Sequence, residues 1–177
     1  MELEVTGDTP VERTGERAVA APPRWVTMSL IALAVLAVDQ ATKAIVRAAL
    51  APGEGVDAVG PYTIFHVHNP GVAGGGFAGN ALPLALLSIL GVMLLYEFLS
   101  QRSRSRVLLA LGFGLLVGGG LGNLVDRARL GWVTDFIRNG EYAFNVADVA
   151  IFSGGLIVLI GLVLGRLRPV HPTSKGA

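Results

Sequence analysis

The sequence predicts an all-α membrane protein, a four-transmembrane-helix bundle with a short strand outside the membrane. Three observations lead to this class. Hydrophobic residues make up 52% of the 177 residues and charged residues only 15%, whereas an ordinary soluble domain has roughly 25% charged residues. Four separate stretches reach the roughly 20 mostly apolar residues that a membrane span needs. Arginines gather at alternate ends of these stretches, as the loops on one side of a membrane require.

The spans belong to one predicted domain, residues 24–167, and lie at about residues 25–46, 81–99, 107–125 and 147–167. The segments on either side are expected to be cytoplasmic tails, residues 1–23 and 168–177. The first tail is polar and has no hydrophobic period, which predicts disorder. The first span does not match a signal peptide, because its apolar stretch continues through Asp39 and Lys43 and the region before it has more acids than bases.

Basic residues give the orientation. The loop between the second and third spans holds three arginines, and Arg24 and the C-terminal end fall on the same side of a four-span chain. Both termini are therefore expected in the cytoplasm, with residues 47–80 and 126–146 forming outer loops. In the first outer loop, the aromatic and β-branched run at residues 62–68 predicts a strand. The glycine-rich run at residues 74–79 that follows is interpreted either as a hinge or as a slack connector.

The first span carries two charged residues where lipid is expected. A charged group at the centre of a span costs at least about 2.5 kcal/mol, so such groups are functional candidates. Asp39 lies about 21 Å along the helix from Trp25, toward the outer half. Asp39 and Lys43 are four residues apart on one helix face. An intrahelical ion pair without any chemistry is therefore an equally good interpretation.

The outer end of the third span presents three polar residues on one face. Asn123, Asp126 and Arg127 have the spacing i, i+3 and i+4. An arginine that snorkels to the interface and pairs with Asp126 would explain two of them. That interpretation does not explain an amide one turn deeper. The same span also has a small-xxx-small face for close helix packing, formed by Gly114, Gly118 and Gly122.

Two further aspartates flank the second outer loop. Asp135 and Asp148 are separated by 13 residues, so the loop keeps them close together. The pattern of Asn145 followed by Asp148 also matches a helix capping box, and residue pattern alone favours that interpretation. A cap, however, does not need a second acid. Two adjacent carboxyls share one proton, so that one can activate water while the other protonates a leaving group.

Other chemistries have less support in the sequence. The chain has no cysteine, which excludes disulfides, thiolate catalysis and cysteine zinc sites. It also lacks a nucleophilic serine motif and a His-Glu-x-x-His motif. His66 and His68 could hold a metal only with a third ligand that is not evident, so no metal or cofactor is expected. A net charge of +1 without a basic stripe argues against a nucleic-acid partner.

Four short motifs follow one another along the chain: Asp39-Gln-Ala-Thr-Lys43, Asn69-Pro-Gly71, Gly122-Asn-Leu-Val-Asp-Arg127 and Phe144-Asn-Val-Ala-Asp148. Val-Thr-Asp-Phe, residues 133–136, stands between the last two. In their order, spacing and placement on the spans they resemble the motifs of the lipoprotein signal peptidases, also called signal peptidase II. These enzymes are aspartic proteases of bacterial membranes. The resemblance covers about residues 38–151.

The resemblance implies that Asp135 and Asp148 are the catalytic dyad. It also implies that eight residues bind substrate or support the site: Asn123, Asp126, Arg127, Asn145, Asn69, Gly71, Asp39 and Lys43. The substrates would be prolipoproteins cut just before a diacylglyceryl-modified cysteine. The protein would be a multi-pass protein of the bacterial cytoplasmic membrane, in contact with membrane lipids, with its site at the outer face on a small extracytoplasmic β-cradle. The family needs no metal and is inhibited by globomycin, and we expect this chain to be a monomer.

The chain departs from the family at two places. Three glycines stand between Ala73 and Phe77 where relatives usually read Asn-x-Gly-x-Ala-Phe, and the loop between the two catalytic motifs is short. Both affect the expected shape of the substrate groove. Two other functions stay open. A metal-dependent phospholipid phosphotransferase would need more acids than this face offers and would be metal-dependent. A proton-coupled transport protein using Asp39 and Asp148 would conduct ions without cleaving peptides.

Overall fold

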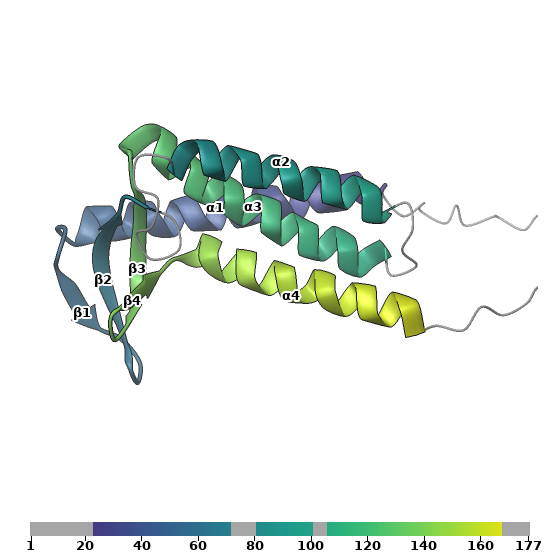
Figure 1. The fold of residues 1–177 in the computed structure, drawn as a ribbon. Helices are drawn as coiled ribbons and strands as arrows, with labels where there is room; N and C mark the ends of the chain where they lie inside the picture. The colour runs from purple at the N-terminus through teal and green to yellow at the C-terminus, as the bar shows by residue number, and fades with distance from the viewer. Residues whose placement is uncertain (1–22, 72–80, 101–105, 168–177) are drawn as a thin grey trace, which may run out of the picture.

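A computed structural model describes residues 23–71, 81–100 and 106–167. Over these residues the chain forms four helices and four strands (Figure 1): α1 Arg24–Ala49, β1 Gly55–Asp57, β2 Tyr62–Asn69, α2 Ala81–Ser100, α3 Arg106–Leu130, β3 Val133–Asn139, β4 Tyr142–Phe144 and α4 Val146–Leu167. Nearly all of both predicted tails, and the glycine-rich run at residues 74–79, lie outside the described residues.

All four helices are long and apolar enough to cross a membrane, so the predicted bundle is confirmed. The helices extend beyond the predicted spans at several ends. The largest difference is in α3, which continues five residues past the predicted end and therefore contains Asp126 and Arg127. The positive charges of the arginines in its last turn interact favourably with the negative, C-terminal end of the helix dipole. The helix ends where Gly131 takes a φ of +84°, a conformation that suits glycine.

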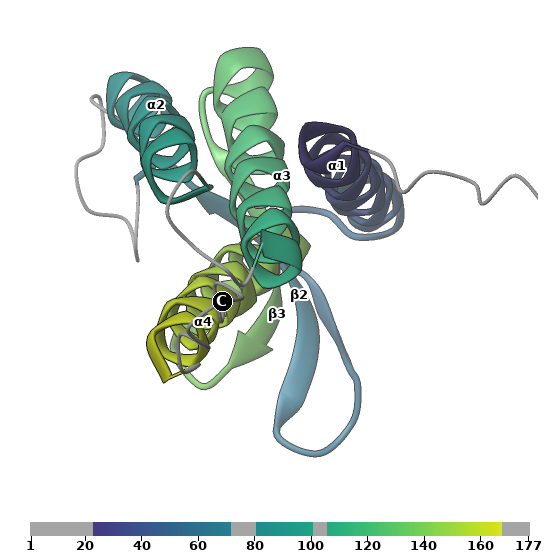
Figure 2. The ribbon, with the colours of Figure 1, turned by 90° about the vertical axis from the view of Figure 1, so that its right-hand side faces the viewer.

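Helix α3 lies at the centre of the bundle and contacts the other three helices. Figure 2, which looks along the bundle, shows α1, α2 and α4 arranged around it. Helix α2 packs mainly on α3 and exposes most of its apolar side chains. In a membrane that exposed surface faces lipid, which is as apolar as leucine, so it needs no protein cover.

The predicted glycine face of α3 packs against α1, which confirms the interpretation of this motif. A Cβ atom on Gly118 would lie 2.7 Å from the backbone carbonyl oxygen of Ala32. A Cβ on Gly122 would collide with the carboxylate of Asp39. The absence of side chains at these positions therefore lets the two backbones approach each other, and at Gly122 it makes room for a buried carboxylate.

A second set of glycines brings α3 and α4 together. A Cβ on Gly112 would lie 2.8 Å from the backbone carbonyl oxygen of Gly154, and one on Gly119 would collide with that of Ala147. Ala147 belongs to the first turn of α4. The close approach at Gly119 therefore fixes the end of α4 that carries Asp148.

The strands form one antiparallel sheet in the order β1-β2-β3-β4. Strand β2 agrees with the predicted strand, and its Val67 pairs with Asp135 of β3. No strand was predicted in the second outer loop, where the structure has β3 and β4, and Asp135 lies within β3. A hairpin signal was present: β3 and β4 are joined by Gly140 and Glu141, and Gly140 has the positive φ of +61° that such two-residue turns use.

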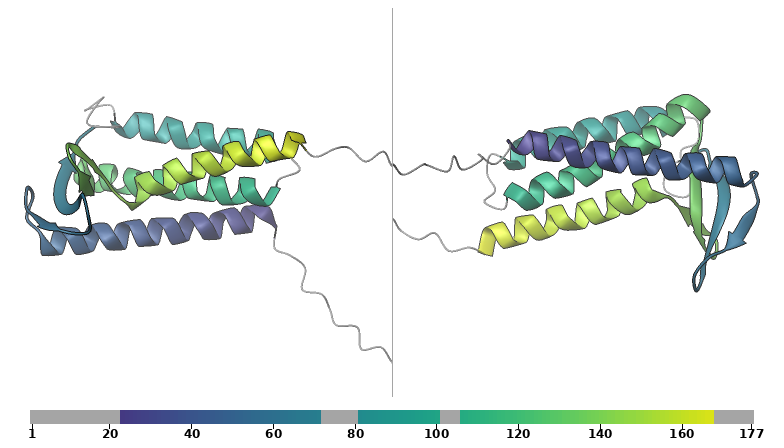
Figure 3. Two further views of the ribbon diagram at one scale, coloured as in Figure 1. Left: turned by 90° about the horizontal axis from the view of Figure 1, so that it is seen from below. Right: turned by 180° about the vertical axis from the view of Figure 1, so that it is seen from behind.

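The sheet lies at one end of the bundle, far from Pro23 and from the end of α4 (Figures 1 and 3). Strand β3 contacts both α1 and α3. The sheet therefore places Asp135 beside the ends of the spans that carry the other candidate residues.

The α1–α3 contact yields a stability prediction. Gly118→Ala should lower the melting temperature in detergent, because overpacking a tight contact costs about 1–3 kcal/mol. Gly155 of α4 is the matched control, since a Cβ there would meet nothing within 4 Å. Gly155→Ala should leave the melting temperature unchanged or slightly higher. A Gly118→Ala protein that melts with the wild type would contradict the close packing of these helices.

Candidate active site

The site is built around Lys43, whose side chain is fully buried. Its ammonium lies 2.9 Å from Asp39 Oδ2 and 3.5 Å from Asp126 Oδ2, and it donates to Asn123 Oδ1 at 2.8 Å. The predicted Asp39–Lys43 pair is therefore present, and its cation also holds two residues of α3. We call Asp39, Lys43 and Asp126 the buried charge cluster. A buried ammonium needs partners of this kind because desolvation penalises an unpaired charge heavily.

The two carboxylates of the buried charge cluster reach the other elements. Asp39 Oδ1 accepts the backbone N–H of Ala147 at 2.9 Å, in the first turn of α4. Asp126 Oδ2 accepts the backbone N–H of Thr134 at 2.9 Å, next to Asp135 in β3. Gln40 of α1 also donates to Asp126 Oδ1 at 3.2 Å. The cluster therefore joins α1, α3, α4 and the sheet at a single point.

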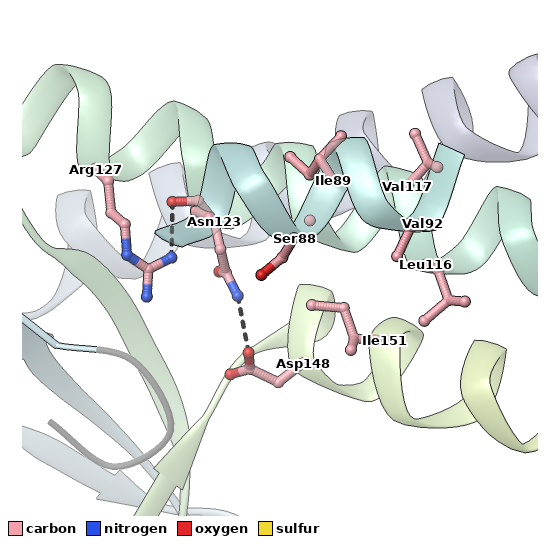
Figure 4. A pocket seen from close by; sticks show the side chains of 11 residues that line it. Ser88, Ile89, Val92, Leu116, Val117, Asn123, Arg127, Asp148 and Ile151 are labelled. Atoms are coloured by element: carbon pink, nitrogen blue, oxygen red, sulfur yellow. Dashed lines mark hydrogen bonds between the residues drawn. The ribbon is translucent and has the colours of Figure 1, made fainter. Parts of the chain in front are cut away.

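Helix α4 begins with the capping box that its sequence suggested. The backbone N–H of Asp148 donates to Asn145 Oδ1 at 3.0 Å, and that of Asn145 donates to Asp148 Oδ2 at 3.1 Å. The other oxygen of Asp148 accepts a hydrogen bond of 2.8 Å from Asn123 Nδ2 (Figure 4). Capping and a place in the site are therefore compatible, because each uses a different oxygen of Asp148.

Asp135 is buried and held by two amides. Asn145 Nδ2 donates to its Oδ1 at 2.7 Å, and Asn69 Nδ2 donates to its Oδ2 at 2.9 Å. The pKa of Asp135 is raised from 3.8 to about 6: burial is the main cause, the neighbouring charge of Asp148 adds to the rise, and the hydrogen bonds from Asn69 and Asn145 oppose it. Asp135 therefore keeps a proton at a higher pH than an ordinary aspartate does.

Arg127 connects the Asn69-Pro-Gly71 motif to α3. Its Nη2 donates to the backbone carbonyl of Gly71 at 2.7 Å and its Nη1 to that of Asn123 at 3.2 Å. The expected Arg127–Asp126 pair is not among the ion pairs of the described residues, where Asp126 contacts Lys43 and Arg47 instead. The guanidinium lines the cavity beside Asp148 (Figure 4).

Asp135 and Asp148 line one cavity of about 410 Å³, the dyad cavity, together with Asn69, Asn123 and Arg127. Its volume lies in the range of small-molecule and peptide sites. It shares residues with two neighbouring cavities. The span cavity, about 280 Å³, lies among α2, α3 and α4 and includes Asp148. The sheet cavity, about 230 Å³, is lined by the strand segments and includes Asp135. The dyad cavity thus shares Asp148 with the span cavity and Asp135 with the sheet cavity.

The structure brings together all ten residues that the sequence suggested for the site, through the contacts given above. It also adds Gln40, Thr134 and Arg47, which sequence reasoning did not select. Arg47 had a signal, because it continues the i, i+4 spacing of Asp39 and Lys43. Thr134 and Gln40 stand beside selected residues, but nothing in their own pattern marks them.

The two histidines of β2 lie apart from the dyad cavity. His66 is buried, with Nδ1 2.8 Å from the carbonyl oxygen of Leu50. His68 stacks on Trp132 with ring centroids 4.5 Å apart. Within the described residues no third histidine, cysteine or acid joins them in a cluster. These contacts hold the two rings against the sheet and the loop around it, and His68 also lines the sheet cavity.

Comparison with known proteins gives consistent results. The sequence model of a family described as Signal peptidase (SPase) II matches residues 31–164. A lipoprotein signal peptidase of Moorella thermoacetica is 36% identical over 137 residues, which cover 76% of this chain and 91% of that protein. One of Dehalococcoides mccartyi is 40% identical over 138 residues, covering 75% and 84%. A solved structure described as a bacterial membrane enzyme has a TM-score of 0.72 at 24% identity, covering 85% and 95% of the two chains, and shows the same fold.

The raised pKa of Asp135 predicts how stability changes with pH. The folded state binds the proton of Asp135 more tightly than the unfolded chain does. The resulting stabilisation is complete below about pH 4 and is lost as the pH rises through about 6. Asp135→Asn removes this titration. The melting temperature of the variant minus that of the wild type should therefore become more positive between about pH 4 and pH 8.

The measurement uses one detergent throughout and follows unfolding by circular dichroism. The same subtraction for Asp57→Asn, an exposed carboxylate of β1, corrects for the loss of a surface charge. A difference for Asp135→Asn that stays constant over this pH range would contradict the burial of an ionisable Asp135.

Proposed function

Because the chain belongs to the signal peptidase II family, we propose that it is an aspartic endopeptidase that removes signal peptides from prolipoproteins with Asp135 and Asp148. The bond cut is the one just before the diacylglyceryl-modified cysteine. Family membership selects this function over the phosphotransferase and the proton-coupled transport protein that the sequence left open.

One observation carries the aspartic mechanism: two carboxyl groups, from a strand and from a helix end, line the same cavity and are oriented by amide donors. Amide donors leave a carboxyl freer to be either ionised or protonated than a direct ion pair with an arginine or lysine would, and among the described residues neither aspartate is in such an ion pair. The dyad can therefore carry one proton between its two members. Asp135, whose pKa is raised to about 6, is suited to hold that proton.

Hydrolysis then follows from the two protonation states. The ionised carboxyl takes a proton from a water molecule, whose oxygen attacks the scissile carbonyl carbon. The protonated carboxyl donates to the carbonyl oxygen, which becomes a hydroxyl of the tetrahedral intermediate. A proton passes to the leaving nitrogen, the C–N bond breaks, and the carbonyl re-forms. The products are the carboxylate of the signal peptide and the free amine of the modified cysteine.

The three cavities suit a substrate that passes from membrane to water. The span cavity offers an apolar wall, formed by Ile89, Val92, Leu116, Val117 and Ile151 (Figure 4). Side chains of a signal peptide, which are embedded in the bilayer, fit such a wall. The sheet cavity lies outside the spans and suits the first residues of the mature protein. The scissile bond is then placed between Asp148 and Asp135, and the exposed Phe152 of α4 gives a lipid-facing surface beside it.

We place the sheet and the dyad at the outer face of the cytoplasmic membrane. Arg24 begins α1 at the end of the bundle opposite to the sheet, and α2 ends and α3 begins, with Arg106, at that same end. The positive-inside rule puts this end and both termini in the cytoplasm. Residues 24–167 form the peptidase domain. Because one chain supplies both aspartates and the residues that orient them, the proposed active form is a monomer.

Replacing either aspartate should nearly abolish cleavage. An amide can neither activate water nor pass on a proton, so Asp135→Asn and Asp148→Asn should each lose most activity while the protein still inserts and folds. The double variant should be no worse than the single ones, because the two groups act as one unit. Signal-peptide release from a diacylglyceryl-modified prolipoprotein in nanodiscs measures this.

Asp57→Asn is the matched control, since it neutralises an exposed carboxylate on β1, and it should cleave at the wild-type rate. If Asp135→Asn or Asp148→Asn kept more than about a tenth of the wild-type rate, the shared-proton mechanism would be wrong.

A further inference from the structure

Arg47 lies in the last turn of α1 and makes two contacts near the site. Its Nη1 donates to Thr134 Oγ1 at 2.9 Å and lies 3.6 Å from Asp126 Oδ1. About a quarter of the side chain is exposed: 27%. Arg47 lies outside the four sequence motifs, and it lines none of the three cavities described above. Any effect of Arg47 on the site is therefore exerted through the residues that it contacts and not by contact with substrate.

Thr134 is the residue through which Arg47 can reach the dyad. It is fully buried and directly precedes Asp135 in β3. Its backbone N–H is held by Asp126 Oδ2 at 2.9 Å and its hydroxyl by Arg47. Successive side chains of a strand point to opposite faces. The Thr134 hydroxyl and Arg47 therefore lie on the face of β3 opposite to the Asp135 carboxyl, and Asp126 holds the backbone of β3 at the same residue.

This grip has a charge component as well. The two carboxylates of the buried charge cluster, Asp39 and Asp126, are met by Lys43 and Arg47. With Arg47 the two carboxylates of the cluster face two cations, and without it they would face Lys43 alone. The Asp126 carboxylate would then be held less firmly. The backbone N–H of Thr134, which donates to it, would lose its fixed position as well.

We propose that Arg47 is a positioning residue for hydrolysis: it holds Thr134 against α3 and so sets the position of the Asp135 carboxyl. The assignment rests on the proposed peptidase function. Among the described residues, the carboxyl of Asp135 accepts hydrogen bonds from the amides of Asn69 and Asn145, and Asn69 lines the dyad cavity in which the substrate is placed. The grip from behind is independent of the substrate, and small displacements of a reacting group are enough to slow catalysis strongly.

The test compares Arg47→Met, Thr134→Val and the double variant. Each single variant removes one side of the Arg47–Thr134 hydrogen bond, and Thr134→Val keeps the size of the side chain and the backbone N–H. Each should lower kcat about tenfold, since a displaced carboxyl meets the scissile bond less often in a reactive geometry. KM should stay within about twofold, because Arg47 does not border the cavities. The double variant should be no slower than the slower single variant.

Arg138→Met is the matched control: Arg138 is on the same strand, but its guanidinium lies over Phe65, 4.6 Å from the ring centroid, and Nε donates to Gly140. It should keep the wild-type kcat. Rates are referred to folded protein, measured by thermal unfolding of each sample. If Arg47→Met does not fold, Thr134→Val alone decides.

A kcat within about twofold of the wild type in either folded single variant, or losses that multiply in the double variant, would overturn the role of Arg47. Failure of the proposed function looks different. In that case the wild type releases no signal peptide, or Asp135→Asn remains active. Activity that requires Asp135 but ignores Thr134→Val rejects the positioning role alone.

Discussion

The structure depends on one buried cation. Lys43 has no exposed surface, and burying an ammonium costs several kcal/mol unless charged and polar groups surround it. Asp39 of its own helix cannot meet this need alone, so Asn123 and Asp126 of α3 complete the shell. The glycine face of α3 makes this possible, because a side chain at Gly122 would occupy the place of the Asp39 carboxylate. The requirement to satisfy Lys43 therefore sets how α1 and α3 pack.

The orientation of the dyad follows from the same cation. Asn123 presents its amide oxygen to Lys43 and to Asn145 Nδ2, which leaves its own Nδ2 to donate to Asp148. Asn145 in turn accepts from the backbone of Asp148 and donates to Asp135. Each amide is fixed in one orientation by its neighbour, so a hydrogen-bonded chain runs from Lys43 to both carboxyls. Networks of this kind are favourable when every member is satisfied and costly when one is lost.

Local pattern in the sequence was enough to predict the helices, the glycine face of α3 and the Asp39–Lys43 pair, because each depends on residues close together in the chain. The partners of Lys43 on α3 are 80 and more residues away in the sequence, and no pattern within α1 predicts them. Strand β3 was not predicted, because a short segment between two long apolar spans gives a strand signal that is weak compared with the helix signal of the spans. Thr134 was missed for a related reason: its importance comes from Arg47 and Asp126, which only the fold brings to it.

The most direct measurement is the thermal stability of Lys43→Met, compared in one detergent with Asp39→Asn and with the variant that carries both changes. Lys43→Met leaves buried carboxylates without their cation, and removing one partner of a buried pair costs about 3–5 kcal/mol. We therefore expect a strongly lowered melting temperature for Lys43→Met and a partial recovery when Asp39 is neutralised as well. A Lys43→Met protein that melts with the wild type, or a double variant no more stable than Lys43→Met, would contradict the central role of the buried cation.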